Sequence, residues 1–257
     1  MYVSLGIFTQ YRRELMGVAT VLILLCHSLL PPAIHCPNDI LRWIIITGNR
    51  GVDIFLFLSG LGMYHSLRKM TKWNRGGVIR WYAKRYRHIL LPYLLICFPY
   101  YLVLGCVNDG HFSISIFLYR LSTLNYWLEH KGFWYIAMLI PLYFLTPFYA
   151  RIIDKTKYQT LLTVTLCIIL LLISTIKIEN NNLFSHVWNN TAFVLQRIPS
   201  YLIGYYMAPS ILKGKKVNLL KLTGIIAGCF LVIKIIFPAN TFWEWSVSYT
   251  HLTLPTN

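Results

Sequence analysis

Acidic residues are scarce in this chain of 257 residues, which has 8 aspartates and glutamates against 24 lysines and arginines. Charged residues make up only 12% of the sequence, whereas hydrophobic residues make up 56%. A soluble domain of this size needs far more charge to cover its surface, so the composition excludes an ordinary soluble protein. The six cysteines include no Cys-x-x-Cys pair and no cysteine–histidine spacing suited to zinc, so we expect no metal site.

Long apolar runs take the place of the missing charge. About seven windows approach the length that a membrane-spanning helix requires, at residues of roughly 15–31, 52–67, 88–107, 133–150, 158–176, 191–209 and 218–238. They predict an all-α fold, a polytopic transmembrane helical bundle, within a membrane domain of residues 1–246. The polar ending VSYTHLTLPTN resembles translated sequencing-adapter nucleotides, so we interpret residues 247–257 as a non-native tail and expect the bundle to be truncated at the C-terminus.

The basic residues gather in alternate connections between these windows. If the N-terminus is cytoplasmic, most lysines and arginines fall on the cytoplasmic side, as the positive-inside rule requires. The sequence therefore predicts a multi-pass protein that contacts membrane lipid and has its N-terminus in the cytoplasm. The net charge of +16 then has a topological explanation, and no nucleic acid partner is expected.

One histidine interrupts the first apolar window. The stretch ELMGVATVLILLCHSLL, residues 14–30, places His27 near its far end, where a bilayer tolerates an imidazole poorly. Two interpretations are open. Either a backbone carbonyl on a neighbouring helix satisfies the ring, or the ring is a general base that takes a proton from a hydroxyl group.

Three further stretches give His27 a context. They are RGVDIFLFLSGLGMY (50–64), the basic YAKRYRHILLPYLL (82–95) and the aromatic GFWYIAMLIPLYFLTPFY (132–149). Together with RRELMGVATVLILLCHS (12–28), in this order and spacing, they resemble acyltransferase family 3 of integral membrane acyltransferases. The resemblance covers about residues 11–150, and more loosely extends to about residue 210.

The resemblance implies a reaction and a compartment. The family transfers an acyl group, commonly acetyl, from cytoplasmic acyl-coenzyme A to a hydroxyl of an extracytoplasmic carbohydrate or lipid-linked sugar. No metal is required for this reaction. We therefore expect an O-acyltransferase in a bacterial plasma membrane, with acetyl-CoA or another acyl-CoA as the donor.

The resemblance also gives His27 the catalytic place. The family pairs this histidine with an arginine eleven positions earlier, where the present chain departs from the pattern and has Met16. Arg13 can share a helical face with Met16 and His27 at about 20 Å from the histidine, so we expect it to take the role near the arriving coenzyme A phosphates. Arg12 is the weaker candidate. Asp53 either orients the imidazole or is an N-terminal acid of the second helix.

Two groups of side chains are candidates for binding. The cations Arg80, Lys84, Arg85 and Arg87 precede the third span, where they anchor the helix by the positive-inside rule, bind coenzyme A phosphates, or do both. On the outward side, the candidates for the sugar are Glu129 and Trp134, beside His130, and Arg197. An interfacial aromatic belt also explains Trp134, whereas Arg197 must face the bundle interior or a wet cavity.

Two rival functions remain open from the sequence. In a transporter or flippase for a lipid-linked sugar, His27, Asp53 and Arg197 would form a proton relay or a substrate pocket. No inverted repeat is detectable to support this. The other rival is a non-catalytic remnant, because Met16 replaces the family arginine. Binding of coenzyme A separates an acyltransferase from a flippase.

Overall fold

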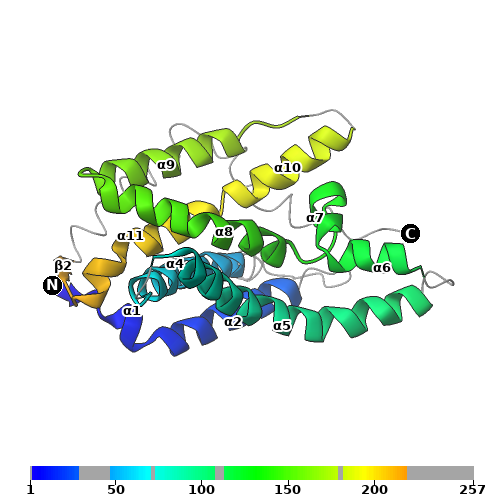
Figure 1. The fold of residues 1–257 in the computed structure, drawn as a ribbon, viewed down its shortest axis with the longest axis horizontal. Coiled ribbons are helices and arrows are strands. Elements are labelled where there is room, and N and C mark those ends of the chain that lie inside the picture. The colour runs from blue at the N-terminus through cyan, green and yellow to red at the C-terminus, as the bar shows by residue number, and fades with distance from the viewer. Residues whose placement is uncertain (1, 29–46, 71–72, 108–112, 179–181, 219–257) are drawn as a thin grey trace, which may run out of the picture. The chain divides into compact units, whose positions relative to one another are not determined.

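The fold is that of a computed structural model, and the structure describes residues 2–28, 47–70, 73–107, 113–178 and 182–218 (Figure 1). Helices predominate, as predicted. The elements in chain order are β1 (Tyr2–Ser4), α1 (Ile7–Gln10), α2 (Arg12–Ser28), the 3-10 helix η1 (Gly48–Arg50), α4 (Gly51–Arg68), α5 (Arg75–Val107), α6 (Ile114–Leu121), α7 (Leu124–Glu129), α8 (Trp134–Lys155), α9 (Gln159–Ser174), α10 (Leu183–Leu195), α11 (Ile198–Leu212) and β2 (Lys216–Asn218). The hydropathy pattern did not predict the short antiparallel pair β1–β2, in which Val3 faces Val217.

The first five predicted windows coincide with α2, α4, α5, α8 and α9. Within the described residues, two helices, α5 and α8, are long and apolar enough to cross a membrane. The prediction of one continuous helix over 191–209 is wrong, because α10 ends at Leu195 and α11 begins at Ile198. The last window, 218–238, lies outside the described residues except for its first residue, and the tail at 247–257 lies wholly outside them.

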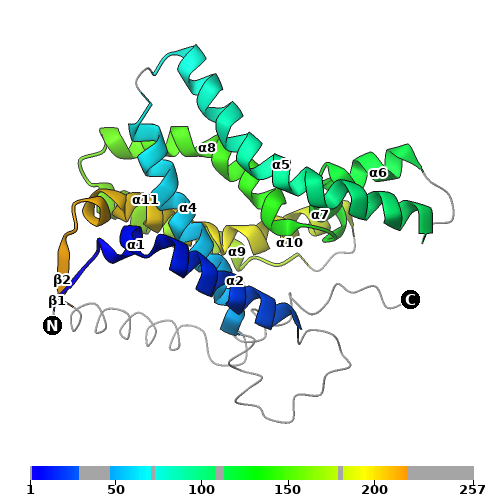
Figure 2. The ribbon, with the colours of Figure 1, turned by 90° about the horizontal axis from the view of Figure 1, so that it is seen from below.

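Helix α5 carries the basic stretch and the third predicted span without a break (Figure 2). Its 33 residues correspond to about 50 Å of helix. In its C-terminal half, Tyr93, Cys97 and Tyr101 are buried at helical spacing and pack against Phe117 of α6. The cations therefore stand on the same rigid helix as the apolar segment.

The described chain forms two compact units, one of residues 1–62 and 200–257 and the other of residues 63–199. In the first unit, α4 and α11 cross with their backbones in contact. A Cβ atom on Gly60 would clash with the Tyr201 carbonyl, and one on Gly204 would clash with the Phe57 carbonyl. Gly60 and Gly204 thus permit the close approach of the two helices.

In the second unit, the polar composition of KIENNNLFSHVWNN (177–190) predicts a loop, and this prediction is wrong for the second half of the segment. Helix α10 begins at Leu183, and Asn182 caps it by accepting a hydrogen bond of 2.8 Å from the Ser185 amide. The Ser185 hydroxyl in turn accepts from the Asn182 amide, which completes a capping box. The polar composition of the segment concealed this helix start.

The glycine crossing gives a test of the first unit. Gly60→Ala should lower the free energy of unfolding by about 1–3 kcal/mol, because the added methyl group must push two backbones apart. Gly17→Ala on α2 is the matched control: nothing lies within 4 Å of its Cβ position, so alanine should raise stability slightly. Thermal unfolding of the full chain in detergent measures both, and equal melting temperatures for the two variants would contradict the crossing.

Candidate functional site

His27 lies in the last turn of α2 with its side chain exposed. Its Nδ1 is 2.8 Å from the carbonyl oxygen of Ile23, one turn earlier on the same helix. Because a carbonyl oxygen only accepts, Nδ1 must carry the proton, and the lone pair of the neutral ring is on Nε2. The carbonyl partner is thus on the helix of His27 itself rather than on a neighbouring helix. The arrangement leaves the ring in the tautomer that a base at Nε2 needs.

Asp53 lies in the first turn of α4. Its carboxylate accepts a hydrogen bond of 3.2 Å from the Ser200 hydroxyl and lies 3.6 Å from Nη1 of Arg50. A carboxylate in the first helical turn also interacts favourably with the helix dipole. These contacts fit an N-terminal acid of α4, and the orienting role toward His27 stays a prediction. Ser200 was not identified from the sequence.

The start of α4 is pressed against α2 close to the histidine. A Cβ on Gly51 would lie 2.9 Å from Cγ1 of Ile23, and one on Gly48 would lie 3.4 Å from Cβ of Cys26. Both glycines would also meet backbone carbonyls of α2. Since only glycine permits this approach, the two elements that carry His27 and Asp53 meet at one crossing.

The two candidate arginines at the start of α2 differ in their surroundings. Nη2 of Arg12 is 2.9 Å from the position that a Cβ on Gly62 would take, so its guanidinium lies against α4. Both arginine residues are exposed. The contact with Gly62 indicates Arg12, the weaker candidate from the sequence, as a cation that lies against α4.

Most of the predicted basic group lines one pocket of about 430 Å³ in the second unit. Helix α5 contributes Arg80, Lys84 and Arg85 to its lining, and the end of α4 with the next residue adds His65 and Lys69. The full lining is His65, Ser66, Lys69, Met70, Gly77, Arg80, Trp81, Lys84 and Arg85.

Helical spacing explains which cations converge on the pocket. Gly77, Arg80, Trp81 and Lys84 share one face of α5, and His65 and Lys69 are one turn apart. That spacing was the signal in the sequence for His65 and Lys69. Arg87, which was also predicted to bind the donor, is exposed and not part of the lining.

The pocket wall is held by a hydrogen bond between its two helices. Nε1 of the buried Trp81 donates to the Ser66 hydroxyl at 2.8 Å. Just beyond the pocket, Arg68 of α4 pairs with Asp154 of α8 at 2.5 Å. The cations of α4 and α5 therefore stand on helices whose relative position is fixed within the unit.

Glu129 forms an exposed network at the end of α7. Its carboxylate accepts from the Tyr119 hydroxyl at 2.9 Å and pairs with Lys131 at 3.0 Å. The hydrogen bond from Lys131 holds the pKa of Glu129 below its usual value, and burial together with Glu129 raises the pKa of Tyr119 to about 12. Glu129 is therefore an ionised hydrogen-bond acceptor at neutral pH.

Trp134 and Arg197, predicted separately, both contact Phe193 of α10. The Trp134 and Phe193 ring centroids are 5.0 Å apart in an edge-to-face arrangement, and the guanidinium carbon of Arg197 is 5.9 Å from the Phe193 centroid. Arg197 is buried at the break between α10 and α11. It faces the interior as predicted, at the end of one helix and the beginning of the next.

His130, which the sequence groups with Glu129 and Trp134 at the outward edge of the fourth span, joins this cluster. Its ring lies 5.7 Å from the Phe193 ring, and its Nδ1 is 2.5 Å from Oδ1 of the buried Asn190. Asn190 was assigned to a loop, so its role was missed. Among the residues that the structure describes, no group of three or more histidines, cysteines and acids could hold a metal ion.

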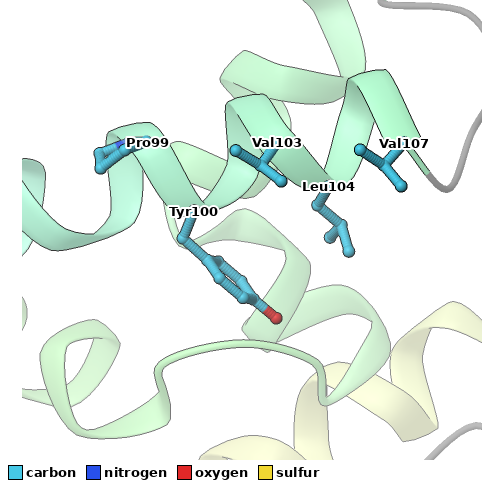
Figure 3. A pocket seen from close by; sticks show the side chains of 5 residues that line it. All are labelled: Pro99, Tyr100, Val103, Leu104 and Val107. Carbon is cyan, nitrogen blue, oxygen red and sulfur yellow. The ribbon is translucent and has the colours of Figure 1, made fainter.

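A second cavity lies on α5 alone. It is an apolar groove of about 410 Å³ lined by Pro99, Tyr100, Val103, Leu104 and Val107. Figure 3 shows these five side chains on the helix. The Tyr100 hydroxyl is the one polar side-chain atom of these five residues. The groove offers neither a charge nor a base, so it suits apolar contact rather than chemistry.

Comparison with known proteins agrees with the resemblance seen in the sequence. The family model described as an acyltransferase domain matches residues 15–255, which include His27, the basic pocket on α4 and α5, and the cluster around Phe193. No curated protein matches the chain. No solved structure matches it either. With nearly its whole length matched by that model, the chain belongs to acyltransferase family 3.

Proposed function

We propose that this membrane acyltransferase moves an acyl group, acetyl in the simplest case, from acyl-coenzyme A to a hydroxyl of an extracytoplasmic carbohydrate or lipid-linked sugar. The observation that carries the donor is the basic pocket on α4 and α5. Coenzyme A bears a diphosphate and a ribose phosphate, and the pocket gathers four lysine and arginine side chains with one histidine. None of its lining residues is acidic.

Charge and geometry both support phosphate as the ligand chemistry. Arg80 and Arg85 offer planar guanidinium forks that bind phosphate oxygens in pairs, and the lysines add point charges. The carboxylate of Asp154 is paired with Arg68 and so does not neutralise the pocket. A volume of about 430 Å³ accommodates the phosphate-bearing end of the donor.

In the proposed reaction, Nε2 of His27 accepts the proton of the acceptor hydroxyl as its oxygen attacks the thioester carbonyl. The new C–O bond forms, the C–S bond breaks, and the leaving thiolate takes the proton from His27. The Nδ1–Ile23 hydrogen bond supports this role because it keeps the lone pair on Nε2. An acyl-histidine intermediate, formed by attack of Nε2 on the thioester, is the second route.

The proposed topology places the donor in the cytoplasm. With a cytoplasmic N-terminus, the end of α4 and the start of α5 face the same compartment, and so does the basic pocket. Acyl-coenzyme A is then bound where it is made. We propose a multi-pass protein of the bacterial plasma membrane on this basis.

The pocket is tested by coenzyme A binding. Arg80→Gln should weaken the affinity of the full chain for coenzyme A by about tenfold or more, because a charge-assisted contact to phosphate is lost. Arg75→Gln is the control, since it removes the same charge from the same helix at an exposed position outside the lining. Titration calorimetry in detergent measures both. Equal affinities for the two variants would remove the pocket as the donor site, and no binding by the parent would favour a flippase.

The base is tested by acetyl transfer. Membranes with the parent chain should move label from acetyl-coenzyme A into envelope glycans, and His27→Ala should lower this at least a hundredfold, the usual scale of a lost general base. Coenzyme A affinity should not change. His186→Ala, which removes an exposed histidine from α10, is the control. Undiminished labelling by His27→Ala at equal protein level would make His27 a packing residue.

The two arginines of α2 can be separated in the same assay. Arg12→Gln should reduce transfer more strongly than Arg13→Gln, because only the Arg12 guanidinium is seated against α4 at Gly62. Both changes remove one positive charge from the same turn, so a purely electrostatic role would give equal losses. A larger loss for Arg13→Gln would restore the prediction made from the sequence.

A further inference from the structure

The basic pocket of the second unit has basic side chains on two walls. Helix α5 contributes Arg80 and Lys84, which are four residues apart and so lie one turn apart on one face. The end of α4 and the residue after it contribute His65 and Lys69 at the same spacing. The Lys69 amide donates to the His65 carbonyl at 3.1 Å, so helical geometry extends to Lys69. Two pairs on different helices therefore line one cavity.

The two walls are joined by the protein itself. The buried Trp81 lies between Arg80 and Lys84 in the sequence, and Ser66 directly follows His65. Nε1 of Trp81 donates to the Ser66 hydroxyl at 2.8 Å. Since this hydrogen bond connects the two basic segments, both walls are in place before a ligand arrives, which lowers the cost of binding.

The chain supplies no negative charge to these side chains. Within the described residues, none of the following four has an ion-pair partner: His65, Lys69, Arg80 and Lys84. All four are exposed. Arg68, on the same turn of α4, is instead paired with Asp154. Like charges that share a pocket repel one another, and an anionic ligand removes this repulsion.

The charge of the lining matches coenzyme A best when the ribose phosphate is counted. Near neutral pH the diphosphate carries about two negative charges, and a phosphate monoester adds about 1.5–2. The lining contains four lysines and arginines and no acid. A phosphopantetheine arm on a carrier protein has a single phosphodiester, with about one negative charge. Such a donor would leave most of the positive charge of the pocket unbalanced.

The ribose ring separates the two phosphate groups of coenzyme A, and the two walls suit this separation. Side chains one helical turn apart, about 5–6 Å between Cβ atoms, can bind the adjacent phosphates of a diphosphate, as Arg80 and Lys84 are placed to do. A phosphate on the other side of the ribose needs a second pair. Lys69 offers a point charge, and His65 offers at least one ring N–H donor whatever its charge.

We propose that His65 and Lys69 bind the ribose phosphate of the donor, so that the enzyme selects coenzyme A thioesters over donors that lack this phosphate. The proposal rests on the proposed function, because it deepens the donor side of that reaction. It gives a role to two side chains of the α4 wall that the basic stretch of α5 does not include. An acyl group on a phosphopantetheine arm is then a poor donor.

Dephospho-coenzyme A is the probe, because it lacks only the ribose phosphate. In calorimetric titration of the full chain in detergent, coenzyme A should bind at least about tenfold more tightly than the probe, the scale of one charge-assisted hydrogen bond. Lys69→Gln should weaken coenzyme A by about tenfold and hardly change the affinity for the probe, so the preference disappears. Arg80→Gln should weaken both ligands by similar factors, because it acts on the diphosphate.

Two further variants control this comparison. Arg75→Gln removes an exposed cation of α5 that does not line the pocket, so it should change both affinities by the same small factor and keep the preference. Melting temperatures should match the parent, since the substituted side chains are exposed. If Lys69→Gln is nevertheless less stable, His65→Ala decides, because it should also reduce the preference for coenzyme A.

Equal affinities of the parent chain for the two ligands would overturn the ribose phosphate site and leave the proposed function standing. A Lys69→Gln variant that folds and keeps the full preference would overturn it as well, because the ribose phosphate would then be bound elsewhere. A parent chain that binds neither ligand would refute the proposed function, and this site with it.

Discussion

The need to satisfy polar groups inside a largely apolar chain is the constraint on which the rest of this structure depends. In apolar surroundings an unpaired donor or acceptor costs several kcal/mol, roughly the margin by which a protein is folded. Nδ1 of His27 is satisfied by the Ile23 carbonyl, and Thr20 bonds in the same way to Met16, one turn back along α2. The Asn190 side chain is satisfied in a similar way, by hydrogen bonds to Tyr126 of α7 and to His130. These hydrogen bonds set the tautomers of His27 and His130.

Charge obeys a related constraint, because the chain has few acidic residues with which to pair its cations. The carboxylates of Asp53, Glu129 and Asp154 are each matched to an arginine or lysine. The cations of the pocket on α4 and α5 have no acidic neighbour in its lining, so they are suited to a ligand that brings its own negative charge. The proposed topology and the proposed donor binding would then use the same residues without conflict.

Much of the helical framework could be predicted from the sequence, since α4, α8 and α9 follow directly from apolar runs of spanning length. The break at Arg197 and the start of α10 could not. Arg197 is buried between two helices, and burial depends on segments that lie elsewhere in the chain. Helix α10 begins at a cap formed by the Asn182 side chain. A hydropathy average over a window of residues detects neither of these features.

The sequence by itself determined the family, the predominance of helices and the concentration of cations before α5, and it made His27 a candidate base, because each follows from residue type and spacing along one segment. Only the tertiary structure decided that His65 and Lys69 join three of those cations while Arg87 does not. It also decided that Phe193 of α10 contacts Trp134 of α8, Arg197 between α10 and α11, and His130 after α7. These groupings depend on which helix faces meet, and that is fixed by packing between segments rather than by any one of them.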